Sequence, residues 1–211
     1  SVSDHLYSIS RRPGETRSLV EPYRAEKRLS ETLGEMQVSE TPSGNGQKLL
    51  LVEGPTEIKA IRKLLAKIDR HHPVVLLPLG GSSMINGHRE DELKEVRKIC
   101  PEVYALVDSE RSHADARESE HHRAFRDSCR RAGITCHILE RRALENYFSG
   151  RAIHQVLGQD FRELKPFETV KDVHGKWPKS ENWKIVQQMS REEFAGTDLW
   201  KFLEKLVSTS R

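Results

Sequence analysis

The stretch KLLLVEGPTE, from Lys48 to Glu57, decides the predicted fold. Leu49 to Val52 form a continuous apolar run without alternation, which is typical of a strand covered on both faces in a parallel sheet. Gly54 permits a sharp turn, and Pro55 fits the first position of a helix, where its missing N–H costs nothing. The stretch predicts a buried strand that turns into a helix. It leaves the carboxylate of Glu53 at the strand's carboxyl end, where open α/β sheets place their ligands.

The same alternation of strand and helix continues along the chain. Apolar residues recur at helical spacing from Ile58 to Ile68. Strands are then expected at Val74–Leu77, Val103–Val107 and Ile134–Leu139, with helices at His88–Cys100 and at Ala114–Ala132, the latter closed by Gly133. This order predicts βαβ units, and therefore an α/β fold with a mainly parallel sheet flanked by helices. Additional C-terminal helices are expected at Arg151–Leu157, Trp183–Met189 and Thr197–Leu206, the last with Thr197 as its N-cap.

Three regions follow from this pattern. Residues 1–46 form an N-terminal arm or linker, with a short strand at His5–Ser10 and a polar helix at Pro22–Met36. The run TPSGNG, Thr41 to Gly46, is a flexible connection. Residues 47–150 form the α/β core, and residues 151–211 a helical extension that packs on it.

Composition describes a polar globular chain. It is 36% hydrophobic and 32% charged, with a net charge of +3, far from the basic excess that would by itself indicate nucleic acid. All basic residues from Arg111 to Arg142 are arginines, which suit phosphate contacts, although a solvated helix face explains them equally. Three cysteines without CxxC spacing predict reduced thiols in a cytoplasmic protein. No stretch approaches the ~18 apolar residues of a membrane span.

Acidic residues follow three of the predicted strands. Glu53 ends the first, Asp108 ends the third with Glu110 two residues on, and Glu145 lies just after the fourth. Strand ends on one edge of a parallel sheet converge, and several carboxylates in close proximity cannot all stay ionised without a cation. A hard divalent ion bound through oxygen resolves that repulsion. Taken singly, each acid has a structural explanation: Glu57, for example, favours a helix N-terminus.

KLLLVEGPTE and the later ALVDSE resemble the two signature motifs of the TOPRIM domain, which topoisomerases, primases and several nucleases share. Glu110 stands where that family usually has its second Asp. VEGPTE, the GGSS loop and LENYF together resemble the OLD-family (overcoming lysogenisation defect) nucleases. Those are bacterial proteins that join an ABC-type ATPase to a C-terminal TOPRIM nuclease.

The resemblance implies a site and a reaction. Two Mg²⁺ or Mn²⁺ ions would be bound by acids of the two motifs and of LENYF, namely Glu53, Glu57, Asp108, Glu110 and Glu145. Lys184, in NWKIVQQM, would contact the scissile phosphate, with Lys176 or Lys179 as alternatives. Ser82 and Ser83 would approach a phosphate, unless their loop is a plain glycine turn. The expected activity is that of a two-metal DNA endonuclease or nickase with little sequence specificity, whose catalytic residues are Glu53, Asp108, Glu110 and Lys184.

The resemblance also implies a partner. The chain contains no GxxxxGK[ST] motif and hence no intact ATP site, so an ABC-type ATPase domain would precede it in the same full-length protein. Two alternatives stay open. One is topoisomerase or primase chemistry, of which the former needs a nucleophilic tyrosine on a partner domain, because Tyr147 is more simply a packing residue. The other is a catalytically silent TOPRIM-like module that binds nucleic acid or a protein.

Overall fold

The computed structural model describes residues 7–10, 19–22, 47–80 and 90–208. The chain divides into two compact units, 1–41 and 42–211. In the first unit, β1 (Tyr7–Ser10) pairs antiparallel with β2 (Leu19–Pro22). The strand expected from His5 is therefore confirmed over its last four residues, whereas the polar helix expected up to Met36 lies outside the described residues from residue 23 onward.

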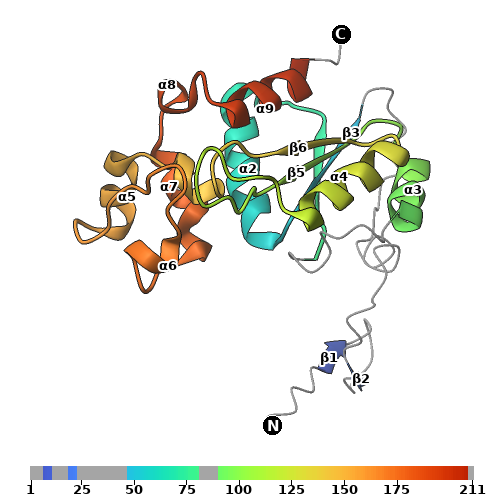
Figure 1. The fold of residues 1–211 in the computed structure, drawn as a ribbon, viewed down its shortest axis with the longest axis horizontal. Coiled ribbons are helices and arrows are strands. Elements are labelled where there is room, and N and C mark those ends of the chain that lie inside the picture. The colour runs from blue at the N-terminus through green and yellow to red at the C-terminus, as the bar shows by residue number, and fades with distance from the viewer. Residues whose placement is uncertain (1–6, 11–18, 23–46, 81–89, 209–211) are drawn as a thin grey trace. The chain divides into compact units, whose positions relative to one another are not determined.

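A four-stranded sheet forms the centre of the second unit (Figure 1). Its order is β4 (Val74–Pro78), β3 (Lys48–Val52), β5 (Val103–Val107), β6 (Thr135–Ile138), and every neighbouring pair is parallel. All five residues of β3 are buried, as its unbroken apolar run predicts. The predicted α/β fold with a mainly parallel sheet is confirmed.

The order of the strands reverses beside β3. The chain leaves β3 for β4 through α2 (Pro55–Ile68), then crosses back through α3 (Glu90–Ile99) to β5 on the other side of β3. It continues in the same direction through α4 (Glu120–Arg131) to β6. Right-handed crossovers then put α2 on one face of the sheet and α3 and α4 on the other, in accord with the contact between α3 and α4. A crevice for ligands is expected at such a reversal, here between the carboxyl ends of β3 and β5.

Helix α4 begins later than the sequence pattern predicts. The expected start at Ala114 is wrong, because Ser119 is extended (φ −61°, ψ 154°) and its Oγ accepts a hydrogen bond from the His122 N–H at 3.2 Å. This N-cap satisfies a free amide of the first turn and fixes the start of the helix at Glu120. Gly133 closes the helix with φ +72°, as predicted.

The C-terminal region is helical, as expected. Thr197 is the predicted cap, since its Oγ1 accepts from the Trp200 N–H at 3.1 Å. Helices α7 and α9 both contact α2. The elements are η2 (Leu144–Tyr147), α5 (Gly150–Leu157), α6 (Val170–Val173), η3 (Lys179–Glu181), α7 (Asn182–Gln188), α8 (Arg191–Phe194) and α9 (Asp198–Ser208).

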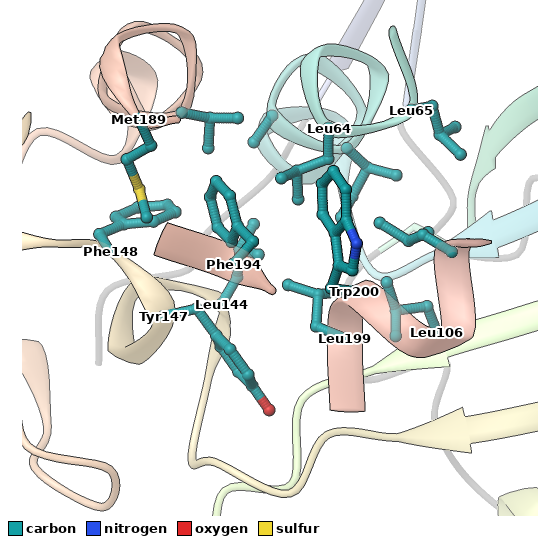
Figure 2. Packing of buried hydrophobic residues seen from close by; sticks show 14 of the residues in the cluster. Leu64, Leu65, Leu106, Leu144, Tyr147, Phe148, Met189, Phe194, Leu199 and Trp200 are labelled. Carbon is teal, nitrogen blue, oxygen red and sulfur yellow. The ribbon is translucent and has the colours of Figure 1, made fainter. Parts of the chain in front are cut away.

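One hydrophobic cluster joins the sheet, α2 and the C-terminal helices (Figure 2). Leu64 of α2 and Met189, Phe194 and Trp200 of the C-terminal region all belong to it. The rings of Phe194 and Trp200 stack with centroids 6.1 Å apart. Because the two predicted regions 47–150 and 151–211 share this core, removing the C-terminal helices would expose apolar surface of α2.

The first residue of β3 is a fully buried lysine. Lys48 has no exposed surface, and its Nζ donates to the Leu206 carbonyl of α9 at 2.6 Å and lies 3.9 Å from Glu102. Burial lowers the pKa of Lys48, and the nearby Glu102 opposes that shift. The amino end of the central strand is thus bonded directly to the last helix.

Candidate metal site at the carboxyl edge of the sheet

Three acids follow three adjacent strands at one edge of the sheet. Glu53 comes directly after β3, Asp108 directly after β5, and Glu145 lies in η2 after β6. Since the strands are parallel and ordered β3-β5-β6, these acids stand at the same edge, with Glu53 and Asp108 at the reversal of strand order.

Hydrogen bonds connect the strand ends. The Asp108 N–H donates to Glu53 Oε1 at 2.8 Å. The Oδ1 atom of Asp108 in turn accepts from the Leu144 N–H at 3.1 Å. Leu144 precedes Glu145, so this chain of bonds fixes the three acids relative to one another.

Glu145 is a buried carboxylate, 1% exposed. Its Oε1 accepts from Asn182 Nδ2 at 3.0 Å and lies 3.3 Å from Lys179 Nζ. The Oδ1 atom of Asn182 accepts from Trp177 Nε1 at 2.9 Å, which orients the amide group. A buried carboxylate requires such partners, and Lys179 and Asn182 supply them.

The electrostatics of the site disfavour several negative charges at once. Burial raises the pKa of Glu53 to about 7, with further upward contributions from Glu57 and Glu110, although the Asp108 N–H opposes the shift. Burial also raises the pKa of Asp108 well above its ordinary value, and the charges of Glu53 and Glu145 add to this. A cation at this edge would favour the ionised forms of both acids.

Lys179 supplies one positive charge here. Burial opposes that charge, but Glu145 and Asp108 outweigh it and raise the pKa of Lys179. Lys184, the predicted phosphate contact, instead forms an ion pair with Glu181, and its Nζ lies 5.7 Å from the centre of the Trp183 ring. The structure thus brings the alternative residue Lys179, rather than Lys184, to the acids. Lys176 is exposed, and Ser82 and Ser83 lie outside the described residues.

Glu57 stands close to the first acid. It is half-buried in the first turn of α2, its Oε2 accepts from the Thr56 hydroxyl at 3.0 Å, and it shares a small hollow with Glu53 and Asp108. The chain bends at Glu53 and Gly54, as predicted, and Gly54 itself is extended (φ −148°, ψ 178°). A Cβ atom at this position would lie 3.0 Å from Glu57 Oε2, so a larger residue would displace the Glu57 carboxylate by a few tenths of an ångström.

Glu110 is exposed and adopts an unusual backbone conformation. Its φ is +53°, the left-handed region that non-glycine residues rarely occupy. Arg142 holds it there from both sides. The Glu110 N–H donates to the Arg142 carbonyl at 2.9 Å, and the Arg142 guanidinium donates to the Glu110 carbonyl at 2.9 Å.

Tyr147 is a packing residue, as predicted. It is 3% exposed, and its hydroxyl donates to Asp198 Oδ1 at 2.6 Å and accepts from the Arg141 N–H at 3.0 Å. Burial raises the pKa of Tyr147. A hydroxyl that is buried, bonded on both sides and hard to ionise is a poor nucleophile.

The arginines of α4 are largely neutralised by acids. Arg126 pairs with Glu118, Arg130 with Asp127, and Arg131 with Glu90. The solvated-face explanation therefore fits this helix. The arginines nearer the acids, Arg111, Arg141 and Arg142, form their side-chain hydrogen bonds with backbone carbonyl groups.

The donor set fits a hard divalent ion. Across the part of the chain that the structure describes, no three Asp, Glu, His or Cys side chains stand close enough together to form a metal centre as they are. Yet the acids at this edge offer carboxylate oxygens, and burial and nearby acids raise the pKa values of Glu53 and Asp108. Oxygen ligands of this kind suit Mg²⁺ or Mn²⁺.

Sequence reasoning missed Asn182 and Trp177. Their connection to Glu145 depends on how η3 and α7 pack against η2, which no local pattern reveals. The only sequence signal is their position around the predicted helix that contains Lys184.

Comparison with known proteins adds no relative. The chain matches no family model, no curated protein and no solved structure. Among residues 47–80 and 90–208, no helix has both the length and the apolar character needed to cross a membrane. The resemblance to TOPRIM domains and OLD-family nucleases stays a prediction.

Proposed function

We propose that this chain is a divalent-metal-dependent DNA endonuclease or nickase domain that hydrolyses phosphodiester bonds with little sequence specificity. The observation that supports this best is the link between Glu53 and Asp108 at the reversal of strand order, with Glu145 on the next strand. Acids converging there, with pKa values raised, need a cation to stay ionised together.

Glu53, Asp108 and Glu145 would hold the metal, with Glu57 and Glu110 beside them. Two Mg²⁺ or Mn²⁺ ions, when bound, would lower the pKa of the attacking water and neutralise charge that develops on the phosphate and the leaving oxygen. The hydrogen bond from Asp108 to Glu53 and the amide of Asn182 keep the carboxylates oriented toward this edge.

Lys179 is the better candidate for the contact with the scissile phosphate. Its ammonium group already lies among the acids, and its raised pKa keeps it charged at neutral pH. Phosphate contacts of this type read no base, which agrees with low sequence specificity.

The experiment is a nicking assay on supercoiled plasmid with Mg²⁺, with Mn²⁺ and with chelator. Wild type should nick only with metal, and Glu53→Gln should not, because it loses a ligand charge while keeping an acceptor for the Asp108 N–H. Glu120→Gln, an exposed acid at the start of α4, is the matched control and should cut like wild type. Equal nicking by wild type and Glu53→Gln would contradict the proposal.

A catalytically silent nucleic-acid or partner-binding module is the second candidate. It is favoured by the Lys179 ammonium group, which already neutralises Glu145 without any metal. Calorimetric titration with Mn²⁺ separates the two. DNA binding without Mn²⁺ binding would support the silent module, and a trapped covalent DNA adduct would instead indicate topoisomerase chemistry. An ABC-type ATPase domain in the same protein and a cytoplasmic location complete the proposal.

A further inference from the structure

A second hollow is lined in part by η2. It has a volume of about 670 Å³, within the range of small-molecule sites. Asn146, the neighbour of Glu145, forms part of its wall. The other residues that matter here are Arg141, Phe148, Arg162, Lys165 and Pro166.

Three cations, Arg141, Arg162 and Lys165, and one acid, Glu163, line this hollow. Arg162 is neutralised, since its guanidinium binds both carboxylate oxygens of Glu168 at 2.8 and 3.1 Å. The acid Glu163 accepts from the Gly150 N–H at the start of α5. In the described part of the chain Arg141 forms no ion pair with a carboxylate, and Lys165 forms none either, although its charge helps to lower the pKa of the nearby Glu168. The Arg141 charge and part of the Lys165 charge are therefore available to an anion.

The Arg141 side chain is held in one position by its contacts. Its guanidinium donates to the Asn146 carbonyl at 2.7 Å and lies 4.8 Å from the centre of the Tyr147 ring. These contacts use only part of its donors, because a guanidinium has five N–H groups. A fixed arginine loses less side-chain entropy when it binds phosphate than a mobile one.

Asn146 connects the wall of the hollow to η2, the short helix that also contains Glu145. Its Nδ2 donates to the carbonyls of Lys165 and Glu168 at 2.6 and 3.0 Å, and its Oδ1 accepts from the Ala143 N–H at 3.0 Å. The segment around Lys165 therefore has a fixed position relative to Glu145. Arg141 and Glu145 are four positions apart in the sequence, so their Cα atoms are at most about 14 Å apart.

We propose that this hollow is a second phosphate subsite, which binds a phosphodiester of the DNA strand near the bond that is cut. The inference rests on the proposed function. A strand of duplex DNA carries one phosphate per about 3.4 Å of helix axis, so the contacted phosphate is within about four nucleotides of the cleaved one. The subsite sets the position of the strand along the metal edge and reads no base.

The test compares charge reversals at two exposed lysines. Lys165→Glu changes the hollow, whereas Lys171→Glu makes the same change on α6, outside its lining. DNA affinity is measured by fluorescence anisotropy with Mn²⁺ over a series of salt concentrations. Both variants carry Glu53→Gln, so that the DNA remains uncut. Lys165→Glu should weaken binding several-fold and lower the slope of log affinity against log salt by about one, and Lys171→Glu should change neither.

A second arm locates the phosphate. Oligonucleotides with one uncharged methylphosphonate link at successive positions should bind more weakly at one position within about four nucleotides of the cut. That loss should vanish in Lys165→Glu. Equal effects of the two lysine variants, or no sensitive position, would overturn the subsite while leaving plasmid nicking intact. Failure of nicking with the lysine effect retained would overturn the proposed function alone.

Discussion

Asp108 donates its backbone N–H to the carboxylate of Glu53 at 2.8 Å, while its own carboxylate raises the need for positive charge at the same place. The bond crosses between two adjacent parallel strands just where both end. It holds two acids close together even though the charge of Glu53 raises the pKa of Asp108. Two adjacent carboxylates that are costly to ionise can bind a cation, and without a cation they destabilise the fold when both are charged.

The raised pKa of Glu53 predicts a pH-dependent loss of stability without metal. The ordinary pKa is 4.5 and the folded value is about 7, so the folded state binds more protons between these values. The free energy of unfolding contributed by Glu53 should therefore fall as pH rises from about 4.5 through 7, by roughly 2 to 3 kcal/mol in all. Urea unfolding of wild type and Glu53→Gln in chelator measures this as a difference between the two proteins.

Mn²⁺ should prevent the fall in the free energy of unfolding of wild type between pH 4.5 and 7, because a bound cation favours the ionised carboxylate of Glu53. A stability difference that stays constant from pH 4.5 to 7 in chelator would show that the Glu53 pKa is not raised.

Replacing Lys179 and Lys184 in parallel should separate their roles. Lys179→Met removes the ammonium group that pairs with Glu145, whereas Lys184→Met removes one that pairs with Glu181. If Lys179 stabilises charge on the phosphate, its loss should lower kcat on the order of a hundred-fold with little change in Mn²⁺ affinity. Lys184→Met should cut at nearly the wild-type rate. The opposite ranking of the two variants would return the role to Lys184.

Asn182→Ala should weaken metal binding without abolishing it. The variant removes the amide that orients Glu145, and loss of such an outer contact costs about 10- to 100-fold in metal affinity. Calorimetric titration with Mn²⁺ gives the affinity, and Gln187→Ala, an exposed position on the same helix, serves as control. Unchanged affinity in Asn182→Ala would mean that Glu145 is not a metal ligand, or that its orientation does not depend on Asn182.

Glu110→Gly should raise the free energy of unfolding and lower the affinity for Mn²⁺. Glycine tolerates φ of +53°, so the free energy of unfolding should rise by up to about 1 kcal/mol. Mn²⁺ affinity should fall, since a ligand charge is lost. Glu110→Ala loses the same charge without the backbone relief, so it should show the lower affinity with no gain in stability. Equal stability of the two variants would argue against strain at this residue.

The parts of the fold that depend on local pattern could be predicted. The apolar runs of β3 and β5, Pro55 at the start of α2, and Thr197 as a cap each follow from properties of single residues or short runs. The start of α4 could not be predicted, because several polar residues before it can act as a helix N-cap. The hydrogen bond from the His122 N–H identifies Ser119 as the cap.

The site divides in the same way. Acids after parallel strands must meet at one edge, so the approach of Glu53 and Asp108 is a consequence of topology. Lys179 and Asn182 reach Glu145 through the packing of η3 and α7, which lie more than thirty residues further along the chain. Their placement depends on contacts between distant segments, and a single sequence contains no direct record of those.

The bond between Lys48 and the Leu206 carbonyl has a practical consequence for any shortened version of the chain. A protein that ends before α9 would remove the acceptor of the Lys48 ammonium group, at the first residue of the strand that precedes Glu53. Loss of its acceptor costs about 1–3 kcal/mol or more for a charged group, in addition to the apolar surface exposed. The last helix and the carboxyl edge of the sheet should therefore unfold as a single cooperative unit, and a shortened chain that keeps the acids in place needs to reach at least Ser208.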